Sequence, residues 1–78
     1  MSRQSPLTIA ARIRREAAAG RMRKRREFAQ AGLAELASEI GVSAPALSRW
    51  ERGLARPTPE HALKWDSTLR EIEGQLSK

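Results

Sequence analysis

The chain has 78 residues, a formal net charge of +6 at pH 7, no cysteine and a single histidine. This length supports one small domain rather than a two-domain catalytic cleft, and the lack of thiols excludes disulfides and thiolate zinc sites. Helix-favouring Ala, Leu, Arg and Glu dominate, whereas strand signals are poor, with no Tyr and one Phe. We therefore expect an all-α fold, a small bundle of four to five helices.

Most of the positive charge lies at the start of the chain. Residues 1–31 hold nine Arg or Lys and two Glu, a net charge of +7, whereas residues 32–78 carry −1. A cationic segment of this kind favours a polyanionic partner, with nucleic acid ahead of a membrane surface. The Arg-rich, acid-poor start is also typical of a transit peptide, but it lacks the apolar core of a secretory signal. No apolar run approaches the roughly 20 residues that span a bilayer.

The first helix is expected to begin at Pro6, because proline fits the first turn of a helix. Ile9, Ile13 and Ala17 recur every four residues and so give this helix one apolar face. Gly20 weakens a helix by about 1 kcal/mol relative to Ala, so either the helix bends there or two helices meet there.

Residues 21–30 continue as helix, with Met22 and Phe28 as candidate core residues. From the charge and the glycine we infer two parts. Residues 1–20 would be a basic, partly helical N-terminal extension, and residues 21–78 a domain that ends in a C-terminal helix.

The central stretch predicts two short helices joined by a tight turn. The apolar residues of the first share one face: Leu33, Leu36, Ala37 and Ile40. Gly41 follows, where a left-handed residue stops a helix, and Ser43 can then cap the second helix. Leu47, Trp50 and Leu54 continue the apolar face, and Gly53 ends the helix. This layout is a helix-turn-helix, whose second helix is built to enter the major groove of DNA.

The last helix is expected to start at Thr58 and Pro59, after a short linker. Its apolar residues alternate at spacings of three and four: Ala62, Trp65, Leu69, Ile72 and Leu76. Alternatively, Thr68 and Glu71 could form a capping box that starts a separate helix. We prefer one continuous helix, whose stripe or the N-terminal helix could form a dimer interface.

Several of these residues together carry a resemblance to a known family: Leu36-Ala37, Gly41-Val42-Ser43, Leu47-Ser48-Arg49-Trp50-Glu51, Gly53 and Pro57. The stretch resembles the helix-turn-helix domain of the phage repressor and Cro family, also called Xre-like, without gaps from about residue 26 to 57. Two places depart from the family pattern. Gly32-Leu33 stands where Thr-Gln is frequent, and Gln30-Ala31 stands where Gly-Leu is usual.

The resemblance implies four base contacts, from Ala44, Pro45, Ser48 and Arg49. Arg49 can bond bidentately to guanine, and Ala44 and Pro45 can press on a thymine methyl group. The alternatives are a surface salt bridge for Arg49 and a simple helix start for Ala44 and Pro45. The resemblance also implies an inward ion pair between Arg26 and Glu51, which makes sense because a carboxylate that faced DNA would repel it.

Phosphate contacts are expected around the second helix and from the basic run. Ser43 lies at a helix N-terminus, which favours anions, and Arg52 and Arg56 flank the helix. Arg23 and Arg25 belong to the basic run, which could follow the DNA backbone or enter the minor groove. The alternative for these arginines is a solvated, charged surface.

These observations favour a sequence-specific DNA-binding transcriptional regulator, a repressor that binds a palindromic operator as a homodimer, with half-sites roughly 34 Å apart. Two alternatives stay open: an antitoxin that holds a toxin and autoregulates its operator, or a basic RNA-binding protein. A second regulator is another possible partner. No catalytic pair, metal cluster or phosphate-binding glycine loop is recognisable, so we expect neither an enzyme nor a cofactor. The expected location is the cytoplasm of a bacterium or a phage-infected host, on the nucleoid.

Overall fold

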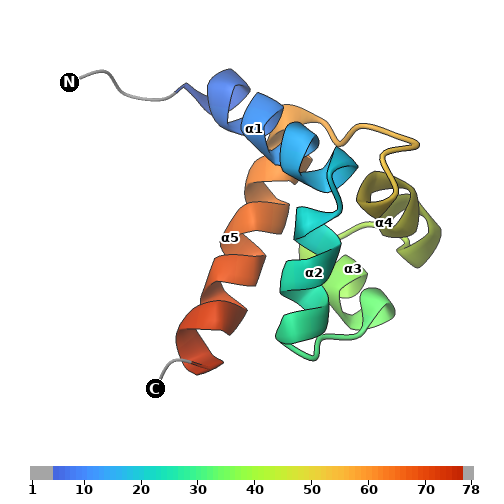
Figure 1. Cartoon of the computed structure of the whole chain (residues 1–78), viewed down its shortest axis with the longest axis vertical. Helices are drawn as coiled ribbons and strands as arrows, with labels where there is room; N and C mark the ends of the chain where they lie inside the picture. The colour runs from blue at the N-terminus through green and yellow to red at the C-terminus, as the bar shows by residue number, and fades with distance from the viewer. Residues whose placement is uncertain (1–4, 77–78) are drawn as a thin grey trace.

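A computed structural model describes residues 5–76, which fold into five helices without a strand. They are α1 (Pro6–Ala18), α2 (Arg21–Phe28), α3 (Leu33–Ile40), α4 (Ala44–Glu51) and α5 (Pro59–Leu76). Figure 1 shows α5 along one side of the molecule, with α1 across the first turns of α5, α2 next to α5, and α4 on the opposite side of the molecule. The all-α bundle with a helix-turn-helix that the sequence predicts is confirmed.

The helix starts follow the capping residues in the sequence. Ser43 Oγ accepts a hydrogen bond from the Ala46 amide at 3.2 Å, and Thr58 Oγ1 accepts one from the His61 amide at the same distance. Gly20 has a φ of +80°, so two helices meet there rather than one helix bending. α5 is continuous, because the Thr68 hydroxyl donates to the Lys64 carbonyl at 2.7 Å inside the helix and does not cap a new one.

One buried core joins all five helices. Its fully buried large side chains come from every helix: Ile13, Met22, Leu36, Leu47, Trp65 and Leu69. Ile13 belongs to α1, whose apolar face packs into this core together with Ala10 and Ala17. The boundary that the sequence suggests at residue 20 stays a prediction, although α1 packs into the same buried core as the other helices.

Two residues that the sequence predicts to lie in the core, Phe28 and Leu54, are exposed. The Phe28 side chain is 85% exposed, because α2 turns Met22, its two ion-paired arginines and the following Ala29 inward and leaves Phe28 on the outer side. Leu54 is 67% exposed. The chain leaves the helix at Gly53, whose φ is +72°, so helical spacing no longer places Leu54 under Trp50.

The stripe along α5 is buried only in its first half. Ala62, Trp65 and Leu69 are fully buried, Ile72 is half-buried and Leu76 is 56% exposed. The helix thus continues past the core that it covers. None of the helices described here is both long and apolar enough to cross a bilayer.

Candidate nucleic-acid interface

The turn between α3 and α4 is set by backbone geometry. Gly41 has a φ of +93°, a left-handed conformation that other residues adopt only at a cost. The amides of Gly41 and Val42 both donate to the Ala37 carbonyl at 2.9 Å, which closes the end of α3. Ser43 then caps α4, so the two helices meet at a fixed angle.

One side of α4 is buried and the opposite side is free. Leu47, Trp50 and Glu51 face the core. The exposed residues Pro45, Arg49 and Arg52 are spaced four and three apart, which places them in one line along the outer side. This exposed line of three residues is the surface that α4 offers to a partner.

The other two expected base contacts lie differently. Ser48 is half-buried beside the exposed line. Ala44 is also half-buried and packs against the core, so it presents little surface to a base. Ala44 therefore offers less surface to a base than the exposed Pro45 and Arg49, and its contact with a base stays a prediction.

A buried ion pair fixes α4 to α2. Arg26 Nε donates to Glu51 Oε2 at 2.7 Å, and Arg26 Nη2 donates to Glu51 Oε1 at 3.0 Å. The side chains are 13% and 4% exposed, and Arg26 Nη1 also donates to the Ala31 carbonyl at 3.1 Å. The hydrogen bonds to Glu51 raise the pKa of Arg26 above its ordinary value, although burial opposes the shift. The pair neutralises the one carboxylate on α4 and ties the helix to both α2 and the loop before α3.

Trp50 is a core residue. Its ring lies 5.6 Å from the Trp65 ring and 5.6 Å from the His61 ring, in tilted arrangements. Only 6% of Trp50 is exposed, so its ring is not available to stack on a base. The aromatic contacts hold the end of α4 against the start of α5.

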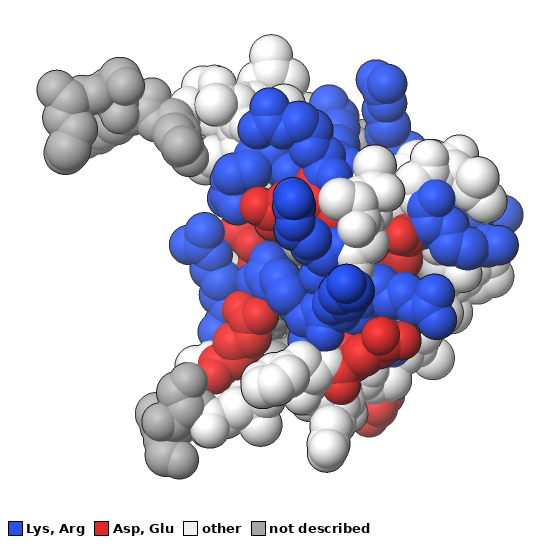
Figure 2. Space-filling model, viewed as in Figure 1, with Lys and Arg blue, Asp and Glu red and all other residues white. Residues whose placement is uncertain are grey.

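The arginines around α4 are not neutralised within the protein. Arg49, Arg52 and Arg56 are exposed, and within residues 5–76 none of them forms an ion pair. Figure 2 shows Lys and Arg side chains spread over α1 and α2 and gathered again at the end of this face where α4 lies. Although Arg52 Nε donates a hydrogen bond to the Ser48 carbonyl at 3.4 Å, these guanidinium groups keep their charge and create a positive potential beside the exposed side of α4.

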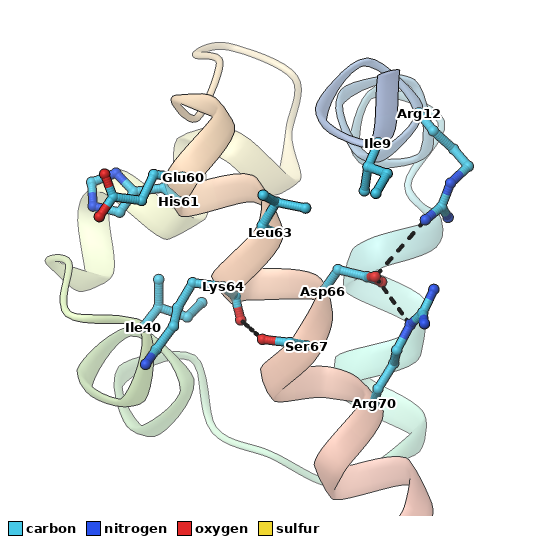
Figure 3. A pocket seen from close by; sticks show the side chains of 10 residues that line it. All are labelled: Ile9, Arg12, Ile40, Glu60, His61, Leu63, Lys64, Asp66, Ser67 and Arg70. Carbon is cyan, nitrogen blue, oxygen red and sulfur yellow. Dashed lines mark hydrogen bonds and ion pairs between the residues drawn. The ribbon is translucent and has the colours of Figure 1, made fainter. Parts of the chain in front are cut away.

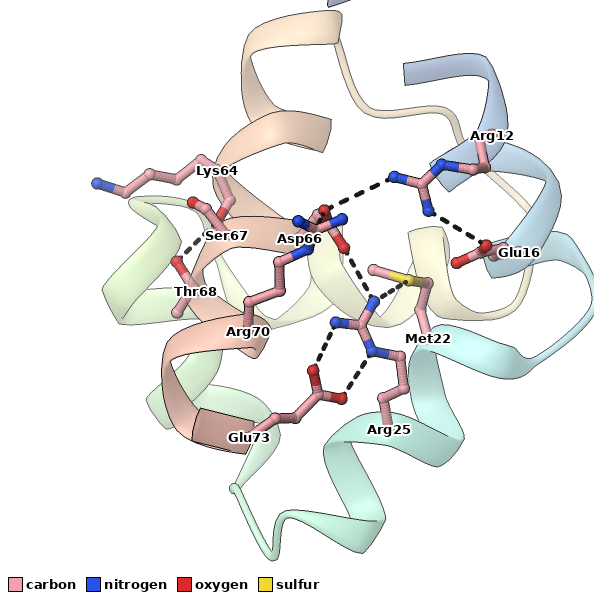
Figure 4. Close-up of polar contacts among 10 residues, drawn as sticks. All are labelled: Arg12, Glu16, Met22, Arg25, Lys64, Asp66, Ser67, Thr68, Arg70 and Glu73. Carbon is pink, nitrogen blue, oxygen red and sulfur yellow. Dashed lines mark hydrogen bonds and ion pairs between the residues drawn. The ribbon is translucent and has the colours of Figure 1, made fainter. Parts of the chain in front are cut away.

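Arg25 is not available for phosphate. Its guanidinium donates to both Glu73 carboxylate oxygens at 2.8 Å and to Asp66 Oδ1 at 3.0 Å, as Figure 4 shows. These bonds raise the pKa of Arg25, and the hydrogen bond from Arg25 lowers the pKa of Glu73 below its ordinary value. Arg25 joins α2 to α5, so its assignment as a phosphate contact is wrong. Arg23 pairs with Glu27 at 3.1 Å, and both side chains are more than half exposed.

A cavity of about 740 Å³ lies between α1, α3 and α5 and has no lining residue from α4. Figure 3 shows Asp66 in its wall, where it forms ion pairs with Arg70 Nε at 3.0 Å and with Arg12 at 3.8 Å. Asp66 is thus paired with Arg12 and Arg70, whereas Glu60 and Lys64 of the same wall form no ion pair within residues 5–76. This cavity is therefore separate from the exposed line on α4.

Arg14 has a role that sequence reasoning did not find. Its Nε and Nη2 donate to the Pro57 carbonyl at 3.0 and 2.8 Å. This fastens α1 to the loop that follows α4. The only signal in the sequence is that Arg14 directly follows the buried Ile13, and nothing there points to a backbone carbonyl 43 residues away as its partner.

The comparisons with known proteins agree with this geometry. A protein-family model described as helix-turn-helix, of the Xre/Cro-like type, matches residues 21–73. The match covers α2, α3, α4 and most of α5, and leaves out α1. No curated protein and no solved structure gave a match.

Proposed function

The chain belongs to the Xre/Cro-like helix-turn-helix family of DNA-binding transcription regulators, and we propose that it is a sequence-specific repressor that binds a palindromic operator as a homodimer. The observation that carries the proposal is the line of Pro45, Arg49 and Arg52 on the free side of α4. That line stands on a helix held by a buried ion pair and by the core, so the helix has a fixed position from which its exposed side chains can reach a groove.

Base contacts in this proposal come from Pro45, Ser48 and Arg49. Arg49 reads a guanine through its O6 and N7 atoms, and each such bidentate contact contributes roughly 1–3 kcal/mol of discrimination. Pro45, which offers no side-chain hydrogen bond, packs on a thymine methyl group. Ser48, beside them, donates to a base edge or to the adjacent phosphate.

Phosphate contacts come from Ser43, Arg52 and Arg56. Ser43 lies where the free amides of α4 start, which favours an anion. Arg52 caps the other end of α4, and Arg56 follows in the loop. These contacts set the position of the protein on the duplex and carry no sequence information.

A homodimer doubles the few base contacts that one eight-residue helix can make. Two half-sites about one helical turn apart, roughly 34 Å, would then form a palindrome. Exposed apolar residues suitable for the interface lie at the far end of α5, at Leu76, and at the start of α1, at Leu7. The cytoplasm, on the nucleoid, is the location that goes with this function.

Selection of bound duplexes from a random pool, together with the mass of the free protein and of its complex, tests the proposal. We expect a palindromic consensus and a complex that contains two copies of the chain. An Arg49→Ala variant should lose discrimination at one base pair of each half-site and keep its affinity for random DNA. Equal binding to all duplexes and to RNA would refute a sequence-specific repressor and favour a basic RNA-binding protein.

A further inference from the structure

α1 lies outside the part of the chain that matches the family, yet it packs directly on the end of the recognition helix α4. A Cβ atom added at Gly53 would lie 3.3 Å from the Ala18 Cα, so the two backbones approach closely where α4 ends. Arg14 holds the Pro57 carbonyl on the other side of the same loop. The position of α1 relative to α4 is therefore fixed at two places.

A groove of about 380 Å³ lies between α1 and this loop. Three arginines line it, Arg14, Arg15 and Arg56, and no carboxylate of the described residues does. Arg14 is committed to the Pro57 carbonyl, whereas Arg15 and Arg56 are exposed and form no ion pair within residues 5–76. The groove is thus a concave, positively charged site with two free guanidinium groups.

The groove also adjoins the exposed line on α4 that we propose binds DNA. It takes in Trp50 and Gly53 at the end of α4 and then Arg56, so it continues the series of free arginines that begins with Arg49 and Arg52. Apolar walls, which include Ala17 and Ala55, strengthen the attraction between a guanidinium group and an anion.

We propose that this groove is a phosphate subsite for the DNA backbone, in which Arg15 of α1 and Arg56 of the loop bind one phosphodiester group together. The inference rests on the proposed function, because it requires a duplex on α4. Guanidinium groups suit such a group because their planar fork matches phosphate oxygens. α1 would then lengthen the footprint of the family domain along the backbone without adding sequence preference.

The test compares Arg15→Gln with Lys64→Gln, a variant with the same change in charge on the exposed side of α5 and with no ion pair lost within residues 5–76. Affinity for the selected duplex and for random DNA is measured from 50 to 200 mM salt. Because Arg56 still contacts the same phosphate, Arg15→Gln should reduce the slope of log affinity against log salt by up to about 0.9 and weaken both duplexes by up to about fivefold at 0.15 M salt. Lys64→Gln should leave the slope unchanged.

The possible results separate this subsite from the function on which it rests. Equal slopes for the two variants would overturn the subsite and leave the repressor proposal standing. A wild-type protein without sequence preference would refute the repressor, but the slope on random DNA would still report on the groove. Inorganic phosphate that shifts the NMR signals of the Arg15 and Arg56 side chains, with no change of slope on DNA, would mean a site for free anions and would overturn the proposal.

Discussion

Replacing Glu51 with Ala should be among the most destabilising changes on the recognition helix. The carboxylate accepts two hydrogen bonds from Arg26, at 2.7 and 3.0 Å, and only 4% of the Glu51 side chain is exposed. Its removal leaves a guanidinium group that is 13% exposed with no ionic partner. Breaking a buried pair in this way costs about 3–5 kcal/mol of the free energy of unfolding. We expect the lower end, about 3 kcal/mol, because Arg26 keeps its bond to the Ala31 carbonyl.

Such a loss is large for this chain. Stabilities of roughly 0.05–0.15 kcal/mol per residue give a domain of this length about 4–12 kcal/mol in total. Urea unfolding followed by the fluorescence of the two buried tryptophans, Trp50 and Trp65, measures the change. With a denaturant slope of about 1–3 kcal/mol per molar, the midpoint should fall by about 1–3 M.

The chain offers a matched control on α2, the helix that carries Arg26. Arg23 and Glu27 of α2 form a pair at 3.1 Å, but their side chains are 57% and 52% exposed. Glu27→Ala should therefore cost at most about 0.5 kcal/mol. In a double-mutant cycle, Arg26→Ala combined with Glu51→Ala should cost less than the sum of the single changes. Additive losses, or a Glu51 variant as stable as the Glu27 variant, would refute the assigned role of the pair.

Four further changes, of which Gly74→Ala is a control, test the backbone and the contact between α2 and α5. Gln30→Gly should stabilise the domain by about 0.5–1 kcal/mol, because Gln30 has a φ of +58°, and a lower urea midpoint would contradict this. Gly53→Ala should destabilise the domain by more than about 1 kcal/mol, because Gly53 has a φ of +72° and α1 lies close to it. Gly74→Ala, in an open part of α5, should stabilise the domain by about 1 kcal/mol. Similar urea midpoints for the two variants would argue against the close packing of α1. The hydrogen bond from Arg25 holds the pKa of Glu73 below its ordinary value of 4.5. The stability that this contact contributes is therefore present above pH 4.5 and is lost as the pH falls through the lowered pKa of Glu73. Glu73→Gln should flatten that part of the acid limb in pH-dependent unfolding, and an unchanged limb would show that the contact is absent in solution.

The elements that the sequence predicts correctly are those with local causes. Gly41 and Ser43 set the turn within three residues, and both act in the structure through their own backbone or hydroxyl group. The departure at Gln30, where the family usually has glycine, also has a local meaning, because the structure requires a left-handed residue there. Sequence reasoning could see that the usual glycine was missing but not that the conformation persists without it.

The roles that the sequence does not reveal depend on partners far along the chain. Arg25 finds its carboxylate 48 residues away, and Arg14 its carbonyl 43 residues away, so neither role can be read from neighbouring residues. Phe28 has the spacing of a core residue on a helix whose inward positions are occupied by arginines in ion pairs. The sequence shows how many arginines the chain has, but only the packing shows which of them are neutralised by carboxylates.

This sorting of charge decides where the molecule can meet a polyanion. Arg12, Arg25 and Arg26 are each bound to carboxylates, so the basic run contributes much of its charge to holding the helices together. The net charge of +6 therefore overstates the role of that run as a DNA-binding arm. Around α4 the opposite holds, because its single carboxylate is buried in an ion pair while Arg49 and Arg52 stay free. A duplex is attracted most strongly where positive charge is uncompensated, and this supports the proposed contact on the free side of α4 and in the adjoining groove.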